Sequence, residues 1–396
     1  MSGTKSTDSG VPVACCIYAI IISWAAAQLT IALPKDPNNA ALLYYQACVT
    51  LPEPQNPLGF ERVVRGADPN DTSRKYLNRR ECRETLELLQ AATELPRCDW
   101  GFVYSRGLPL PTEILSPLMR LGVLLKVHAC TLAIDGRHKE AIEICLRMRR
   151  LARHLSDETY LMYAVSSQTD REALLAIQYV LGCLPPDGRV LTWVRDQLAV
   201  QGTPWRPQEA LSSFRDMSLQ FRLAHQKDFA NWGVRDVRVS QEQSANKQAQ
   251  PLTDRQMLDG ARRSFDQFLK AVLGIIESDL GCEQKQTELE RQENLWTGQA
   301  SKGDPILLLM EPVENVRGYF RLHMDNLVLT NAVMAALEVY LVKARTGELP
   351  EVLPNNVPKD PYNGKDFTYE RSERGFLIRS SPSPFGPRKT RQFEFK

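Results

Sequence analysis

The sequence predicts a mainly α-helical protein with a transmembrane helix near its N-terminus and a small β-hairpin near its C-terminus. Three observations support this fold class. Residues Val11 to Leu33 form an uncharged apolar run. Most of the chain after Pro34 has apolar residues that recur every three or four positions, which is the period of a helix. The last part of the chain instead carries short β-prone runs beside glycine-containing turns.

The run from Val11 to Leu33 is 23 residues long and contains no Asp, Glu, Lys or Arg. At about 1.5 Å per residue, a helix of this length reaches roughly 34 Å and crosses a hydrocarbon layer of about 30 Å. The stretch Ala14 to Ala27 also fits a cleaved secretory signal peptide. Because the apolar character continues beyond Ala27, we expect a retained anchor, with residues 1–10 as a cytoplasmic tail. No later run is expected to match its length.

The composition is that of a folded protein with balanced charge. Of the 396 residues 43% are hydrophobic, which is enough for one large core or two smaller ones. Lys and Arg total 49 against 47 for Asp and Glu, so the net charge of +2 gives no support for a nucleic-acid-binding surface. The basic run Arg147-Met148-Arg149-Arg150 lies within a helical pattern, where we expect a solvated face.

Residues 34–347 are expected to form a helical domain. The clearest pattern lies between Leu115 and Leu155, where two series of apolar residues at steps of three and four flank Asp135-Gly136. Two antiparallel helices joined by a tight glycine turn follow from that pattern. A further helix is predicted to begin at Ala40 and to stop near Pro52. Others are predicted near 79–93, 156–181, 189–200, 254–280 and 313–346, and the polar stretch near 234–253 is expected to be a loop.

The tail from residue 348 to residue 396 has a different character. Turn residues Asp360 to Lys365 precede a β-prone run at Phe367 to Glu370, and a second run covers Phe376 to Arg379. These runs predict a hairpin with its turn near Ser372 to Gly375. Since a lone hairpin is marginally stable in water, we expect it to pack on the preceding helix.

The region around Asp135-Gly136 resembles a tetratricopeptide unit. Ala129 and the stretch Gly136 to Ala141 place small residues and a glycine where the two helices of such a unit touch and turn. A regular array needs about three stacked repeats, and only one unit stands out. The resemblance therefore implies a tetratricopeptide-like bundle rather than a solenoid.

Several short segments resemble an uncharacterised family of membrane-anchored proteins from planctomycete-type bacteria. The residues that carry the resemblance in the tail are Val357 to Lys365, Phe367, Tyr369, Gly375 and Phe376, and their strand pattern is similar to that of type II secretion pseudopilins. Four earlier segments have the family's order and spacing: Asn39 to Ala47, Arg97 to Trp100, Gly136 to Ala141 and Leu151 to Leu155. The resemblance implies a bacterial inner-membrane protein whose bulk is periplasmic. It implies no established activity.

The chain departs from the resemblance at two points. Leu349 stands where such proteins carry an aromatic residue between a glycine and a proline. Pseudopilins bind calcium through acidic residues after the last strand, whereas Glu394 is the only acid between Ser380 and Lys396. We therefore expect no metal and no cofactor.

No sequence pattern typical of a catalytic centre stands out. The chain lacks a glycine-rich phosphate loop, a GxSxG elbow and an HExxH helix. Three side chains are the best catalytic candidates: Asp99, His154 and Glu172. Each has a structural alternative. Asp99 would accept backbone hydrogen bonds while Trp100 fills the base of the bundle. His154 would stabilise carbonyls at a helix end. Glu172 would be either a buried acid with a raised pKa, which suits catalysis, or simply a partly exposed side chain.

Seven cysteines lie outside the apolar run, and none has the spacing of a zinc site or a CxxC motif. They are Cys48, Cys82, Cys98, Cys130, Cys145, Cys183 and Cys282. One or two disulfides would fit an oxidising compartment. Cys130, Cys145 and Cys183 stand at apolar helix positions, where we expect small buried thiols.

These observations favour a non-catalytic, single-pass membrane-anchored scaffold that binds another envelope protein through the concave side of its helical hairpins. The expected partners are the membrane, through Val11 to Leu33, and a protein rather than nucleic acid. A component related to secretion or pilus assembly is one alternative, indicated by the anchor and the tail. A hydrolase of envelope polymers, with Asp99, His154 or Glu172 as acid or base, is another.

Overall fold

The computed structural model describes residues 38–54, 68–103, 112–156, 160–202, 211–212, 215–216, 253–300, 310–373, 375–385 and 390–395. The predicted anchor at Val11 to Leu33 lies outside these residues, as does the polar stretch near 234–253 up to residue 252. By its contacts the chain divides into two units, Met1–Asn38 and Asn39–Lys396. All of the helices and strands described below belong to the second unit.

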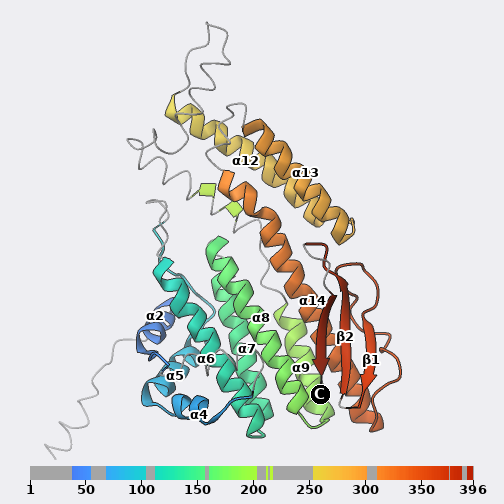
Figure 1. The fold of residues 1–396 in the computed structure, drawn as a ribbon. Helices are drawn as coiled ribbons and strands as arrows, with labels where there is room; N and C mark the ends of the chain where they lie inside the picture. The colour runs from blue at the N-terminus through green and yellow to red at the C-terminus, as the bar shows by residue number, and fades with distance from the viewer. Residues whose placement is uncertain are drawn as a thin grey trace, which may run out of the picture. The chain divides into compact units, whose positions relative to one another are not determined.

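The described part of the chain is mainly α-helical, with ten α-helices and a three-stranded antiparallel sheet at the C-terminal end, which confirms the predicted fold class in its coarse form (Figure 1). The helices are α2 (Ala40–Thr50), α4 (Asp71–Leu77), α5 (Arg80–Glu94), α6 (Leu115–Ile134), α7 (His138–Ser156), α8 (Tyr160–Cys183), α9 (Gly188–Gln201), α12 (Asp254–Glu277), α13 (Cys282–Ala300) and α14 (Met310–Thr346).

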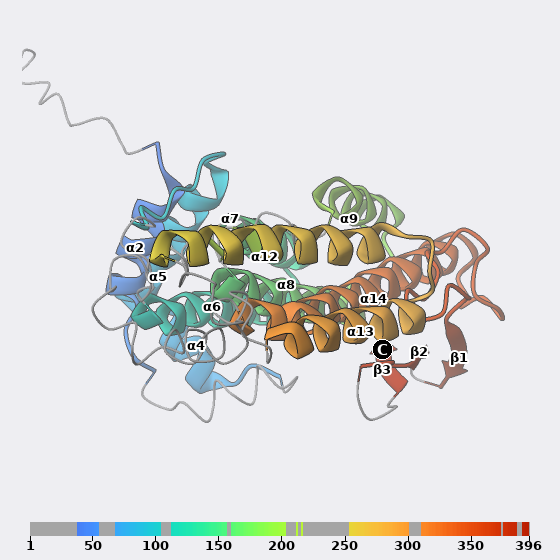
Figure 2. The ribbon, with the colours of Figure 1, turned by 90° about the horizontal axis from the view of Figure 1, so that it is seen from above.

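Two of these helices, α4 and α13, were not expected. Helix α4 has only seven residues, too few to show a helical period. Helix α13 is rich in Glu and Gln, and its buried apolar residues, Cys282, Leu289 and Trp296, recur only every seventh position. Such a narrow stripe is enough here because α13 contacts both α12 and α14, and all three helices run in similar directions (Figure 2).

Helices α6 and α7 form the predicted hairpin. Gly136 has φ +76°, a left-handed conformation that glycine adopts without a steric penalty. The N–H of Gly136 donates to the carbonyl of Ala133 (3.1 Å), and the N–H of Arg137 donates to the carbonyl of Leu132 (2.9 Å). These two hydrogen bonds cap the C-terminal end of α6. Helix α8 packs against both partners, and the three helices lie side by side (Figure 1).

By length and composition, α6 and the segment Val316–Thr346 of α14 are also apolar enough to cross a membrane. Both segments contain charged residues, such as Arg120 and Lys126 in α6, so neither repeats the uncharged run from Val11 to Leu33. In the most apolar 18-residue stretch of each helix, 67% is buried inside the protein for α6 and 56% for α14. Core helices meet the same test, and both helices pack against several neighbours.

The tail forms three strands in the order β1 (Thr368–Ser372), β2 (Gly375–Pro382) and β3 (Thr390–Phe395). The predicted hairpin is present as β1 and β2, but the expectation of a hairpin alone was wrong because β3 pairs with β2. Only two apolar residues of β3, Phe393 and Phe395, are buried, so its local pattern was weak.

The sheet packs on α14, as expected for strands that are marginal alone. The ring of Tyr340 on α14 lies 5.2 Å from that of Phe376 and 6.4 Å from that of Phe395, centroid to centroid. The two phenylalanine rings stack on each other at 5.0 Å. These three buried rings join the sheet to the helical core.

A polar turn strengthens this attachment. Asp360 is fully buried, and its carboxylate accepts hydrogen bonds from the backbone N–H groups of Tyr362 (3.0 Å) and Ser381 (2.6 Å). The hydroxyl of Tyr362 donates to Asp325 on α14. Asn331, one turn and a half further along α14, donates to the carbonyl of Lys359 (2.8 Å). The turn is thus bonded both to the sheet and to the helix.

Candidate functional site

The structure brings together three segments that are far apart in the sequence, around Tyr44, Trp100 and His154, which we call the aromatic cluster. The rings of Tyr44 and Trp100 stack with centroids 5.6 Å apart. The hydroxyl of Tyr44 lies 2.9 Å from Nδ1 of His154, and Nε1 of Trp100 donates to the carbonyl of His154 (2.8 Å). Helices α2 and α7 are therefore joined through the loop that follows α5.

His154 lies in the last turn of α7, the position for which a role at a helix end is predicted. The structure adds a contact with another helix, because Nδ1 is bonded to the Tyr44 hydroxyl on α2. The neighbouring acids Asp157 and Glu158 lie outside the described residues. Burial raises the pKa of Tyr44 well above its ordinary value, so this phenol stays protonated at neutral pH.

Asp99 has the structural role described above as the alternative to catalysis. Its carboxylate accepts from the N–H of Gly101 (3.0 Å) and pairs with Arg97 (3.2 Å). The Asn39 side chain bonds both the N–H and the carbonyl of Asp99 at 2.8 Å. The hydrogen bond from Gly101 and the charge of Arg97 lower the pKa of Asp99. Trp100 is buried, as that alternative predicts.

Glu172 lies on α8 and pairs with Lys126 on α6 at 2.6 Å. The two side chains are 13% and 4% exposed, so the pair is largely buried. Nε2 of Gln168 donates to the second carboxylate oxygen at 2.7 Å. The pair thus links α6 to α8. Removing either charge would leave the other largely buried without its partner.

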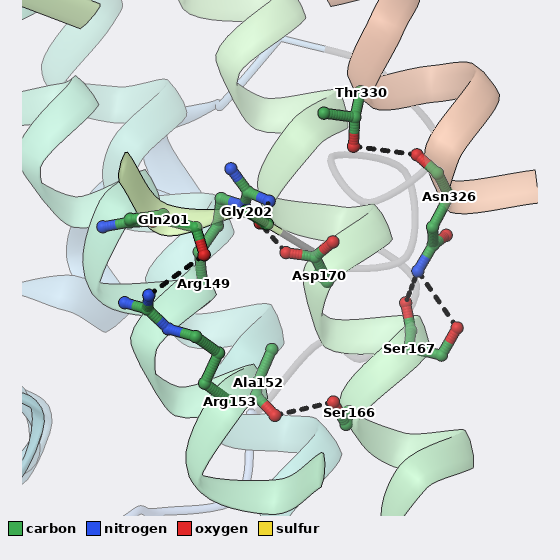
Figure 3. Close-up of polar contacts among 10 residues, drawn as sticks. All are labelled: Arg149, Ala152, Arg153, Ser166, Ser167, Asp170, Gln201, Gly202, Asn326 and Thr330. Carbon is green, nitrogen blue, oxygen red and sulfur yellow. Dashed lines mark hydrogen bonds and ion pairs between the residues drawn. The ribbon is translucent and has the colours of Figure 1, made fainter. Parts of the chain in front are cut away.

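A second buried ion pair links α7 and α8. Nε of Arg149 donates to Asp170 at 2.8 Å, and each side chain is only 1% exposed (Figure 3). Arg149 also donates to the carbonyl of Gly202, and Arg153 donates to the carbonyl of Gln201 (3.1 Å). Both acceptors lie at the end of α9. The expectation of a solvated basic face was therefore wrong for Arg149, which shares a helix face with the buried residues Cys145 and Ala152.

Further buried polar side chains adjoin this pair, and together they form what we call the polar layer: Arg149, Ser166, Ser167, Asp170 and Asn326. Ser166 donates to the carbonyl of Ala152 (2.6 Å), and Asn326 on α14 donates to the carbonyl (2.8 Å) and the hydroxyl (3.0 Å) of Ser167 (Figure 3). Nη1 of Arg149 and Oδ2 of Asp170 are buried without hydrogen-bond partners in the described part of the chain. The layer binds α7, α8, α9 and α14 in one arrangement.

Sequence reasoning missed the polar layer. The only available signal was a pair of opposite charges, Arg149 and Asp170, each standing in an otherwise apolar series on neighbouring helices. Periodicity identifies the buried face of a helix, but it does not identify which charge on the next helix will compensate a buried one.

A surface cleft of about 400 Å³ lies between α4, α5 and α6, and we call it the α4–α6 cleft. It is lined by Arg74, Leu77, Asn78, Arg83, Leu86, Glu87, His128, Thr131, Leu132, Asp135 and Arg137. Arg74 pairs with Asp135 (2.6 Å) and Arg137 with Glu140 (2.6 Å). Arg83 makes no ion pair within the described residues.

His128 contributes a half-buried, uncharged imidazole to this cleft. Burial, together with Arg137 and Arg147, lowers the pKa of His128 to about 4. Its Nδ1 has no hydrogen-bond partner in the described structure. The lining therefore combines three guanidinium groups and a neutral imidazole with two carboxylates and three leucines. Two of the guanidinium groups are ion-paired, which leaves Arg83 as the lining arginine without an ion pair among the described residues.

The seven cysteines from Cys48 to Cys282 are free thiols. Cys130 and Cys145 are buried as expected, whereas the expectation for Cys183 was wrong because this residue is exposed. It is the last residue of α8. In the described ranges, His, Cys, Asp and Glu form no group of three that could hold a metal ion.

Comparisons of the chain with protein-family models, with curated proteins and with solved structures gave no match. No function therefore transfers to the chain from a relative. The described side chains are the basis for the functional assignment.

Proposed function

We propose that this chain is a non-catalytic, single-pass membrane-anchored scaffold of the bacterial cell envelope, whose tetratricopeptide-like helical domain binds a partner protein in the α4–α6 cleft. The observation that supports the binding surface is Arg83, a guanidinium that lines the cleft and makes no ion pair with a described residue. The uncharged run Val11 to Leu33 supports the anchor, and the resemblance to planctomycete proteins supports an inner membrane location with a periplasmic domain.

The chemistry of the cleft defines the kind of partner it fits. Arg74 and Arg137 are already engaged in ion pairs, whereas Arg83 makes no ion pair with a described residue, although Glu87 lines the same cleft one turn further along α5. A guanidinium in this state pairs well with a carboxylate, which it can bind through two parallel hydrogen bonds. The leucines at positions 77, 86 and 132 offer apolar contact next to it. An acidic segment that also carries apolar side chains meets both requirements.

The contacts of the three catalytic candidates favour a scaffold over an enzyme. Asp99 holds its own loop, His154 joins α7 to α2, and Glu172 joins α8 to α6. Each side chain is bonded to groups that keep helices or loops in place. Arrangements of this kind stabilise a binding surface, because they make the helices that carry it rigid.

Crosslinking in intact cells tests the proposal. The chain carrying Arg83→Glu is compared with the unchanged chain and with Arg80→Glu, a matched charge reversal on the same helix. Arg80 is a suitable control because its side chain is 84% exposed and pairs only with Glu84, away from the cleft. We expect Arg83→Glu to abolish capture of the partner, while Arg80→Glu leaves it unchanged.

Two outcomes would contradict the proposal. Equal capture by the Arg83→Glu and Arg80→Glu chains would exclude the cleft as the binding surface. A turnover of envelope polymers that Asp99→Ala or His154→Ala abolishes, in variants that unfold at the same temperature as the unchanged chain, would favour the hydrolase instead.

A further inference from the structure

Helix α2 has no charged residue in its eleven positions. One side of it, with Ala40, Ala41, Tyr44 and Ala47, is buried against α5 and α6. On the opposite side Leu42 is 46% exposed and Val49 is 88% exposed. Surface helices of water-soluble domains normally carry charged or polar residues on that side. The outer side of α2 is therefore unusual.

Leu42, Gln46 and Val49 are four and three positions apart, so they share one face of α2, which we call the α2 outer face. All three residues are exposed. Two exposed apolar residues, Val103 and Met119, stand on segments that contact α2. The hydroxyl of Tyr45 donates to the carbonyl of Trp100 (2.9 Å), close to Val103 in the chain, and Arg120, next to Met119, pairs with Glu53 just after α2.

The α2 outer face is also close in sequence to the proposed anchor. Six residues separate Leu33, the last residue of the apolar run, from Ala40, the first of α2. Fully extended, that link spans at most about 25 Å. The start of α2 is fixed on the domain, because the N–H of Ala40 donates to the carbonyl of Arg97 (2.9 Å). An anchored domain therefore keeps α2 next to the bilayer.

We infer that the α2 outer face contacts the lipid headgroup region of the bilayer that holds the anchor. This inference rests on the proposed membrane attachment. An uncharged face can enter the headgroup region without removing a charge from water, and its apolar side chains gain from leaving water. The tether makes the contact intramolecular, so a weak affinity is enough to keep it formed. The contact would orient the whole helical domain on the membrane.

Photocrosslinking of the full chain tests this contact. Benzoylphenylalanine replaces Val49, and in matched controls it replaces Val200 on α9 or Val352 after α14, which are 82% and 74% exposed. Each chain is reconstituted in vesicles of phosphatidylethanolamine and phosphatidylglycerol, irradiated, and examined by mass spectrometry. We expect lipid adducts at position 49 to exceed those at positions 200 and 352 by about tenfold or more. Equal lipid adducts at all three positions would overturn the inference.

A second measurement separates this inference from the proposed anchor. A carbonate wash of the membranes tests the anchor by itself. If the chain stays with the membranes but Val49→benzoylphenylalanine gives only protein adducts, the lipid contact is wrong and the anchor stands. If the chain leaves the membranes, both are wrong. Since Val49 is almost fully exposed, the substitution should leave the unfolding temperature unchanged, and that temperature is measured for every variant.

Discussion

Arg149 on α7 and Asp170 on α8 form an ion pair of 2.8 Å in which both side chains are only 1% exposed. A second donor group of Arg149 reaches the carbonyl of Gly202 after α9, so one side chain connects three helices. A buried pair of this kind contributes less to stability than its Coulomb energy implies, because both charges have lost their water. Its main effect is that neither charge can be accommodated without the other.

Arg149→Met is expected to lower the free energy of unfolding by about 3–5 kcal/mol, because Asp170 would remain as an uncompensated buried charge. The double variant Arg149→Met with Asp170→Leu should recover most of that loss. Urea unfolding of the detergent-solubilised full chain, followed by circular dichroism, measures both. Arg80→Gln, which breaks an exposed pair, is the control and should cost less than about 1 kcal/mol. A single variant as stable as the unchanged chain would contradict the prediction.

The aromatic cluster should respond to substitution in a graded way. Tyr44→Phe removes the hydroxyl bonded to His154 and is expected to cost about 0.5–1.5 kcal/mol. Trp100→Ala removes a buried indole and its hydrogen bond to the His154 carbonyl, and it should cost about 3–5 kcal/mol. The same unfolding measurement compares the two. If both changes cost equally little, the cluster does not join α2 to α7.

Acid should destabilise the protein through two histidines, His128 and His323. Burial lowers the pKa of each to about 4, and nearby cations, Arg137 for His128 and Lys285 for His323, act in the same direction. The unfolded chain takes up a proton near pH 6.5, so the stability held above that pH is lost as the pH falls from about 6.5 to about 4. Each histidine should account for about 1–2 kcal/mol between pH 7.5 and pH 5.

His128→Gln should remove its share of that pH dependence. Unfolding free energies at pH 7.5 and pH 5 are compared for this variant and for His138→Gln, a histidine at the start of α7 outside the cleft lining. The difference between the two pH values should shrink for His128→Gln alone. An unchanged difference would mean that another group causes the acid sensitivity.

Thiol reactivity should follow burial. Burial raises the pKa of Cys130 and of Cys282 to about 12 and that of Cys48 to about 11. The reactive thiolate is therefore scarce at pH 8, and alkylation of Cys130 and Cys282 in the folded chain should be about a thousandfold slower than after unfolding. Mass spectrometry of iodoacetamide-treated protein locates the modified residues. Rapid labelling of Cys130 before the exposed Cys183 would contradict the prediction.

Asp360→Ala should loosen the C-terminal sheet without unfolding the helices. The substitution leaves the buried N–H of Tyr362 and the part-buried N–H of Ser381 without their acceptor, at an expected total cost of about 1–3 kcal/mol. Limited proteolysis should then cut within the tail faster than in the unchanged chain. Asp366→Ala, which removes only an exposed pair with Lys359, is the control and should leave the cleavage rate unchanged.

Much of the helical architecture could be predicted from the sequence because its causes are local. The turn at Gly136 required only a glycine able to adopt positive φ between two apolar series, and the structure has that turn. Helix α9 begins after Asp187, whose side chain accepts from the N–H groups of Arg189 and Val190. Helix periodicity and capping depend on residues within a few positions of one another.

The candidate site was predictable only in part. Asp99 and Trp100 make the contacts that the structural alternative for this pair predicts, but the sequence does not predict the Tyr44 hydroxyl as the partner of His154, 110 positions away. The α4–α6 cleft depends on α4, which was too short to predict. Its arginines come from three separate segments, and no local pattern relates them.

By itself, the sequence determined where most helices run, which of their faces are apolar, and that one uncharged segment is long enough to cross a membrane. Only the tertiary structure decided that Arg149 is compensated by Asp170, that β3 completes the sheet, and that the outer face of α2 stays uncovered within the protein. The physical reason is the range of the interactions. Backbone conformation and hydrophobic period are set within a few turns of the chain, whereas the partner of a buried charge or of an open strand edge is set by the packing of elements that are distant in sequence.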